Sequence, residues 1–206
     1  MLDLPRRVTE AAHRIGGHVE ATPLIRSWPL SHRTGAEVYL KLESLQRTGS
    51  FKLRGALNKL LSLTDEQRRN GVVAASTGNH GLAVAHALSV ARCSGTICLP
   101  DNAAALKVEA LRQLGASVTF HGTDCEQTER FARARAAEEG RQFVSPYNDP
   151  SVLAGQGTVG VEIARQLDAP ADVVVTSVGG GGLMAGVGSY LRSVAPAVRL
   201  VGCWPE

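Results

Sequence analysis

The chain has 206 residues, of which 44% are hydrophobic and 20% charged, an ordinary composition for a globular protein with one or two cores. A net charge of +3 is too small to indicate nucleic acid or an anionic membrane as partner, and 4% aromatic residues are too few for base-stacking platforms. No apolar run approaches the roughly 20 residues of a membrane helix, and the charged N-terminus does not resemble a signal peptide.

The cysteines form no CxxC pair and no zinc-type spacing: they are Cys93, Cys98, Cys125 and Cys203. Unpaired thiols are usual in a reducing compartment. We therefore expect thiols without a structural role in a cytoplasmic protein.

Short apolar runs alternate along the chain with longer segments of helical period. The runs predict strands over 37–42, 72–75, 95–99, 117–121, 142–144, 172–177 and 199–203. The longer segments predict helices near 51–63, 79–92, 104–114, 125–139, 152–167 and 183–194. Strands that alternate with helices are typical of parallel sheets covered on both sides, so the predicted fold class is α/β.

Two breaks interrupt this alternation. Residues 145–150 contain two prolines around turn-forming residues, and residues 63–65 precede a polar stretch that ends at Gly71. We therefore expect a smaller α/β domain over 71–146, inserted into a larger domain formed by 1–70 and 147–206.

The first segment with chemical potential is Ser50-Phe51-Lys52, at the start of a predicted helix. Ser50 is a good N-cap residue, which would place Lys52 in the first turn. The helix dipole disfavours a positive charge there, so a neutral amine suited to Schiff-base chemistry is easier to obtain. Taken alone, a solvated surface lysine is the simpler interpretation.

The second segment, Ser76-Thr77-Gly78-Asn79-His80, connects a predicted strand to a predicted helix. Its hydroxyl and amide groups stand beside the free N–H groups of a helix N-terminus, where a carboxylate would bind well. Helix capping by the same side chains is an equally good interpretation on local grounds. A lone histidine such as His80 is more often structural than catalytic.

The third segment is a run of four glycines, Gly179, Gly180, Gly181 and Gly182, between a predicted strand and a predicted helix. Such a turn points several N–H groups and the positive end of the helix dipole at one place, which favours phosphate binding. A flexible turn is the alternative. The spacing Gly180-x-Gly182-x-x-Ala185 also matches a loose dinucleotide fingerprint, but the next strand ends without the acidic residue of such a site.

Together, these segments resemble the fold type II pyridoxal-phosphate (PLP) enzymes, the tryptophan synthase β-like group that includes serine/threonine dehydratases (ammonia-lyases) and serine racemases. Residues 50–56 resemble the PLP-lysine motif of that family, 76–81 its substrate-carboxylate loop and 177–182 its phosphate loop. Shorter stretches at 22–24, 40–43, 107–109 and 154–158 also resemble the family and occur in the same order along the chain as in its members. The resemblance implies two open, twisted, mostly parallel sheets flanked by helices.

The resemblance also implies pyridoxal 5′-phosphate as cofactor, bound covalently by Lys52, which then removes the Cα proton of the substrate. It implies that Phe51 packs beside the cofactor ring and that Asn79 hydrogen-bonds the 3′ oxygen of the ring. The phosphate would be bound by Gly179, Gly180, Gly181 and Gly182. The substrate-binding residues that it implies are Ser76, Thr77, Gly78, Asn79 and His80.

The implied reaction is a lyase reaction of amino-acid metabolism: β-elimination from threonine, serine or a similar hydroxy amino acid, giving a 2-oxo acid and ammonia. Thr77 stands where serine racemases have a serine as second acid/base, which makes it a second candidate catalytic residue. The extra methyl group of threonine favours elimination over racemisation. The alternatives are a serine racemase-type isomerase and a catalytically impaired fragment that binds PLP or phosphate.

The end of the chain departs from the family pattern. Trp204 stands where members with a divalent-cation site place a glutamate, so we expect no metal there. Members of the family continue beyond the position of Glu206, and that part usually supplies the neutral partner of the pyridine nitrogen. The resemblance thus implies an incomplete larger domain with an exposed sheet edge. It also implies a small amino-acid substrate and a homodimer, with no nucleic-acid or membrane partner.

Overall fold

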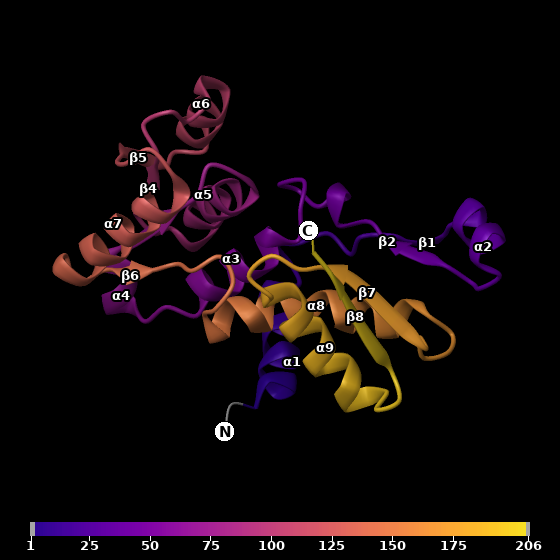
Figure 1. Cartoon of the computed structure of the whole chain (residues 1–206). Coiled ribbons are helices and arrows are strands. Elements are labelled where there is room, and N and C mark those ends of the chain that lie inside the picture. The colour runs from indigo at the N-terminus through magenta and orange to yellow at the C-terminus, as the bar shows by residue number, and fades with distance from the viewer. Residues whose placement is uncertain (1–2, 205–206) are drawn as a thin grey trace.

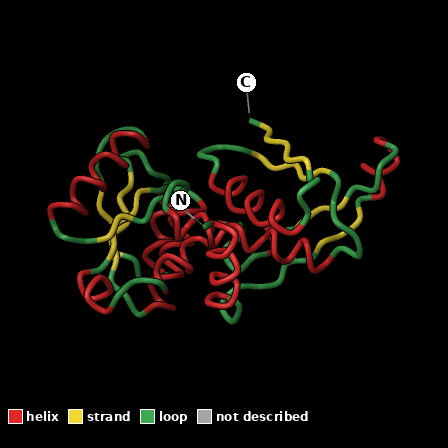
Figure 2. The backbone as a smooth tube through the Cα atoms, turned by 90° about the horizontal axis from the view of Figure 1, so that it is seen from below, coloured by secondary structure: helices red, strands yellow, loops and turns green. Residues whose placement is uncertain are grey.

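Figure 1 shows a computed structural model of the chain, in which residues 3–204 are described. A sheet of four strands lies at one end of an elongated molecule, and two pairs of strands lie toward the other end. Figure 2 shows this separation from below, with helices filling the space between the sheets. Within residues 3–204, no helix is long and apolar enough to cross a membrane.

The four-stranded sheet is wholly parallel, in the order β5-β4-β3-β6. Its strands are β3 (Val72–Ala75), β4 (Gly95–Leu99), β5 (Ser117–Phe120) and β6 (Gln142–Phe143). The first two have the predicted bounds, and the other two end one residue earlier than predicted. All four lie inside the segment 71–146, although the division of the chain into domains stays a prediction.

Each face of this sheet is covered by helices because successive side chains of a strand point to opposite faces. Val72 and Ala74 belong to the core that α5 (Asn79–Ala91) also enters. Val73 and Ala75 pack in a separate cluster with alanines of α7 (Cys125–Glu138). Because both faces of β3 are buried, its sequence is apolar at every position.

The strands at the other end form two pairs. β7 (Val173–Ser177) and β8 (Arg199–Cys203) are parallel, with α9 (Gly182–Val194) connecting them. β1 (Leu24–Arg26) and β2 (Tyr39–Lys41) are antiparallel, joined through α2 (Trp28–Thr34). The predicted class, α/β with mostly parallel sheets, is therefore confirmed.

Several predicted boundaries need correction. The strand predicted over 37–42 is shorter, and its partner β1 was not predicted. The pair is antiparallel because Gly35, at φ 70°, ends α2 in the left-handed conformation and the chain then runs back along β1. The helices absent from the prediction are α1 (Leu4–Ile15), α2, the 3₁₀ turn η1 (Glu43–Leu45) and α4 (Asp65–Asn70).

Two of these helices were missed for different reasons. In α1 the buried residues Val8, Ala11 and Ile15 follow helical spacing, so the apolar face that a periodicity analysis detects is present and was overlooked. The six-residue α4 has no buried residue and is stabilised by a capping box between Thr64 and Gln67. It therefore offers no apolar stripe to a periodicity analysis.

The predicted N-cap of α3 (Lys52–Leu61) is also wrong. Phe51 occupies the N-cap position in a right-handed α conformation, and the Oγ atom of Ser50 has no hydrogen-bond partner among the described residues. Because Phe51 is already helical, Ser50 lies one residue too early to cap the free N–H groups. Lys52 nevertheless lies in the first turn, as predicted.

The long helix α8 (Pro150–Gln166) packs against α1, α3 and α9 and forms the centre of the molecule. Glycines bring its neighbours unusually close. A Cβ atom on Gly155 would lie 2.4 Å from the carbonyl oxygen of Arg54, and one on Gly186 would lie 2.6 Å from the backbone nitrogen of Gly157. The starts of α3 and α9 are therefore positioned by backbone-to-backbone contact with α8.

A buried ionic cluster ties α3 to α8 and β2. The guanidinium of Arg54, which is 0% exposed, donates to both carboxylate oxygens of Glu43, at 2.8 Å each, and to Glu162 at 2.6 Å. Lys41 donates to the same Glu162 at 2.6 Å. Charges taken out of water are tolerated only when they are paired and hydrogen-bonded in this way.

We predict that Arg54→Leu lowers the free energy of unfolding by about 3–5 kcal/mol, because it leaves two partly buried carboxylates facing one remaining cation. Urea unfolding measures the change. Arg6→Ala breaks an exposed pair with Glu10 and should cost less than about 0.5 kcal/mol. Equal losses of unfolding free energy in the two variants would mean that the buried cluster contributes no more to stability than an exposed ion pair.

Candidate functional site

Lys52 begins α3, and its amine is turned toward the segment that follows β6. Its Nζ atom donates to the carbonyl oxygen of Pro146 at 2.8 Å. Burial lowers the pKa of this amine from its ordinary value of 10.5. The Lys52 side chain is thus partly shielded from water and easier to deprotonate than a surface lysine.

The neighbouring Phe51 places an aromatic ring close to this amine. Its ring centroid is 5.1 Å from the Nζ atom of Lys52. The residue packs against the hydrophobic cluster between α8 and α9 that includes Ile163 and Leu191. An aromatic ring therefore borders the amine.

The second predicted segment follows the carboxyl end of β3. The Oγ atom of Ser76 accepts from the N–H of Gly78 at 3.1 Å and so closes the turn before α5. Because α5 begins at Asn79, the N–H groups of its first turn have no partner within the helix. A cavity of 260 Å³ opens here, lined by Thr77, Gly78, Asn79, Leu82, Leu106, Lys107, Ala110 and Leu111.

His80 is structural in its hydrogen bonding. It is 3% exposed, and its Nε2 atom lies 2.9 Å from the carbonyl oxygen of Val144. Because a carbonyl only accepts, Nε2 carries the ring proton. Burial lowers the pKa of His80 to about 4, with the nearby charge of Lys52 contributing, so the imidazole is neutral at neutral pH.

The third predicted segment follows the carboxyl end of β7. Gly181 adopts φ 80° and caps α9, whose first residue is Gly182. Cβ atoms on Gly179 or Gly181 would meet no atom within 4 Å, so the turn borders open space. The turn and the free N–H groups of α9 together form a concave group of donors suited to an anion.

The three predicted segments are joined by residues 144–147, which we call the 144–147 segment. Val144 accepts from His80, Pro146 accepts from Lys52, and the ring of Tyr147 lies against Gly180. The sequence analysis placed Val144 at the end of a strand and interpreted Ser145, Pro146 and Tyr147 only as part of a break between domains. Its prolines marked a loop, but no local pattern revealed contacts to residues more than sixty positions away in the chain.

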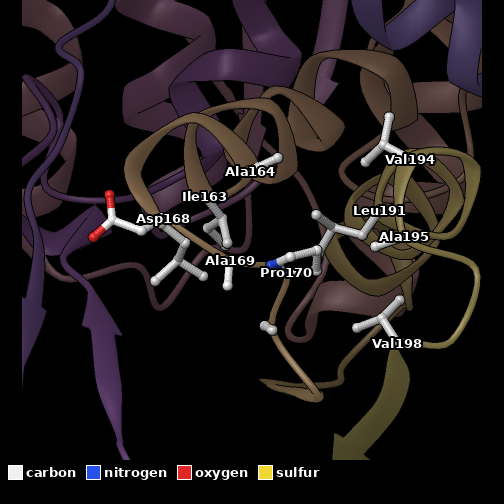
Figure 3. A pocket seen from close by; sticks show the side chains of 11 residues that line it. Ile163, Ala164, Asp168, Ala169, Pro170, Leu191, Val194, Ala195 and Val198 are labelled. Atoms are coloured by element: carbon white, nitrogen blue, oxygen red, sulfur yellow. The ribbon is translucent and has the colours of Figure 1, made fainter.

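A second cavity, of 210 Å³, lies at the far ends of α8 and α9. Figure 3 shows its lining of aliphatic side chains such as Ile163, Leu191 and Val198, with Asp168 as the charged member. It contains none of the predicted site residues. Because it lacks a set of converging polar groups, it is not a candidate catalytic site.

Comparison with known proteins identifies the family. A model of the family described as "Pyridoxal-phosphate dependent enzyme" matches residues 15–206. The chain belongs to this family. The predicted family and its cofactor, pyridoxal phosphate, are therefore confirmed.

Among curated relatives, the catabolic L-threonine dehydratase of Escherichia coli (strain K12) is 42% identical over 97% of this chain and 60% of its own length. The L-threo-3-hydroxyaspartate ammonia-lyase of a Pseudomonas species is 41% identical, over 97% of this chain and 62% of its own length. The chain thus spans about 60% of the length of such relatives.

Solved structures show the same fold. The processed threonine deaminase isoform 2 of Solanum lycopersicum superimposes with a TM-score of 0.93 and 35% identity, over 98% of this chain and 59% of that chain. The serine racemase of Dictyostelium discoideum superimposes with a TM-score of 0.91 and 33% identity, over 98% of this chain and 65% of that chain. The predicted fold type II architecture is therefore confirmed.

The residues of this region fit pyridoxal phosphate. Its aldehyde reacts with an uncharged amine, and the half-buried Lys52 has a lowered pKa. Its phosphate needs several N–H donors around open space, and the glycine turn before α9 offers them at Gly179 and Gly181. The 144–147 segment contacts both groups and so sets them in one region.

The lowered pKa of Lys52 predicts a pH-dependent stability of the protein without cofactor. Between this lowered pKa and 10.5, the unfolded chain binds a proton that the folded chain has released, so unfolding becomes less favourable as pH rises. Lys52→Met removes this contribution. We expect the variant to exceed the wild type in stability most near neutral pH, with the difference shrinking toward pH 10.5.

Urea unfolding of both proteins over this pH range tests the prediction. A constant difference between them at every pH would show that folding leaves the proton affinity of Lys52 unchanged.

Proposed function

We propose that this chain contributes to PLP-dependent β-elimination, converting a small hydroxy amino acid such as threonine or serine to a 2-oxo acid and ammonia. The observation that carries the proposal is the Lys52 amine, half-buried at the start of α3 and hydrogen-bonded to the carbonyl oxygen of Pro146 beside the glycine turn. The names of the relatives, threonine dehydratase and hydroxyaspartate ammonia-lyase, support the same reaction type.

The proposed cofactor-binding residues lie at the starts of three helices, α3, α5 and α9. Lys52 would bind the aldehyde covalently, with Phe51 beside the ring and Asn79 donating to its 3′ oxygen. The phosphate would lie on the N–H groups of Gly179, Gly180, Gly181 and Gly182. The open space at Gly179 and Gly181 supports this assignment.

The proposed substrate-binding residues belong to the turn between β3 and α5. The segment Ser76, Thr77, Gly78, Asn79 and His80 would bind the substrate carboxylate at the positive end of the α5 dipole. Because the N–H of Ser76 donates to the carbonyl oxygen of Cys98 and that of Gly78 to Ser76 Oγ, the donors would be the N–H groups of Thr77, Asn79 and His80. The neutral state of His80 leaves this task to N–H donors rather than to a charged side chain. The 260 Å³ cavity beside Thr77 has room for a small side chain.

The proposed proton transfer centres on the Nζ atom of Lys52. Bound pyridoxal phosphate supplies an electron sink for the negative charge left at Cα. Lys52 accepts the Cα proton at Nζ, and the carbonyl oxygen of Pro146 orients the amine for this step. Burial favours the neutral amine that the step requires.

A second candidate is isomerisation of the serine racemase type. It needs a proton donor on the opposite face of Cα, and the hydroxyl of Thr77, a residue that lines the cavity, is the candidate group. The fold similarity to a serine racemase supports it. The third alternative is binding of PLP without turnover.

The remaining assignments rest on the sequence. From the family resemblance we propose a homodimer acting on a small amino acid, and from the unpaired cysteines we propose a cytoplasmic location. From the two breaks in the pattern of elements we propose the division into a domain over 71–146 and another over 1–70 and 147–206.

The test is to mix the 206-residue chain with PLP and then with L-threonine or L-serine, measuring absorbance and the 2-oxo acid formed. We expect a coloured adduct that borohydride reduces and that peptide mapping places on Lys52. Lys52→Arg should abolish the adduct and lower turnover by roughly 10²–10⁴-fold or more, because proton transfer at this position is lost.

Lys59→Arg is the matched control, because it removes an amine from the same helix and keeps the ion pair with Asp149. It should keep both adduct and product. An adduct on another lysine would overturn the assignment of Lys52. D-serine formed from L-serine would favour isomerisation, and an adduct without product would favour a binding fragment.

A further inference from the structure

Tyr147 lies between the amine and the glycine turn, and neither the sequence motifs nor the proposed chemistry gives it a role. Its ring packs so closely on Gly180 that a Cβ atom there would lie 2.2 Å from the Cγ atom of Tyr147. Its own carbonyl oxygen would lie 2.9 Å from a Cβ atom on Gly182. Tyr147 therefore contacts two of the four glycines of the turn.

The glycines of the turn are required for different reasons. Gly181 has φ 80°, a left-handed conformation that residues with a side chain rarely adopt. Gly180 is not among the residues with positive φ, so its backbone would accept a side chain. What excludes a side chain at Gly180 is Tyr147, because its ring and its Cβ atom would both lie within 2.6 Å of a Cβ atom there.

Tyr147 is itself held on two sides. Its N–H donates to the buried Ser145 Oγ at 3.4 Å, and its phenol donates to Glu129 of α7 at 3.3 Å. The residue before it, Pro146, accepts from Lys52. Tyr147 therefore connects the glycine turn to Lys52 and to a helix that covers the four-stranded sheet.

We propose that Tyr147 is a positioning residue, whose ring fixes the backbone of the glycine turn in the conformation that binds the cofactor phosphate. Four consecutive glycines have large conformational freedom, and ordering them on binding opposes affinity. The ring limits this freedom before the anion arrives, so that less ordering is left to the binding step. The inference depends on the proposed function for the identity of the anion.

The test compares two ligands that differ only in the phosphate, PLP and pyridoxal, by titration of the cofactor-free chain. In Tyr147→Ala, the affinity for PLP should fall by about tenfold or more, the expected effect of releasing even one glycine backbone. The affinity for pyridoxal should change much less, because pyridoxal makes no contact with the turn. Tyr147→Phe keeps the ring and should bind PLP nearly as the wild type does.

A double-mutant cycle with Gly180→Ala adds a specific signature. In the wild-type background, the added methyl collides with the ring and should weaken PLP binding. In the Tyr147→Ala background, the Cγ atom that would lie 2.2 Å from the methyl is absent and only the Cβ atom at 2.6 Å remains, so the same methyl should weaken PLP binding less. If circular dichroism shows that the alanine variant is unfolded, Gly180→Ala alone is titrated with PLP and with pyridoxal, and only PLP should bind more weakly.

Three results would overturn the inference. The first is an equal loss of PLP and pyridoxal affinity, which would mean a general structural role. The second is an unchanged affinity for PLP, and the third is additive effects in the cycle. A wild-type chain that binds no PLP would overturn the proposed function together with the inference, whereas wild-type binding with any of the three results overturns the inference alone.

Discussion

The interaction on which the rest of the structure depends is the burial of Arg54 between Glu43 and Glu162. A fully buried guanidinium has a fixed number of donors to satisfy, and here they are directed at two carboxylates on different elements. Moving α3 relative to α8 or η1 would leave charge unpaired in a region from which water is excluded. Since Arg54 lies half a turn after Lys52, the constraint that places the guanidinium also places the amine.

The helix contacts extend this constraint from the amine to the glycine turn. Gly155 of α8 touches the backbone of α3. Gly157, two residues later in the same helix, touches Gly186 of α9. Contacts between backbones leave no side-chain rotamers that could absorb a shift. The first residues of α3 and α9 are therefore fixed on a common helix, and the 144–147 segment, which leads into that helix, reaches both.

The sequence was informative wherever local chemistry decides the structure. The apolar strands β3 and β4 and the glycine turn follow from composition and spacing. The position of Lys52 in a first turn was predicted correctly, although the N-cap residue is Phe51 and not Ser50. Polar helices such as α4 lack the apolar stripe that a periodicity analysis detects, although the spacing of Thr64 and Gln67 carries a capping signal. The role of Tyr147 could not be predicted, because it arises from contact with Gly180, which is distant in the chain.

The electrostatics of the site follow from the same arrangement. Burial, rather than a neighbouring charge, is what lowers the pKa of Lys52, and the adjacent His80 is neutral. The N-termini of α5 and α9 add positive potential through N–H groups that cannot lose or gain protons, and Lys107 is a basic side chain in the lining of the cavity beside Thr77. In the proposed function, the two helix ends would receive the phosphate and the carboxylate. The amine of Lys52 would then be left to take up a proton, because backbone N–H groups have no part in proton exchange.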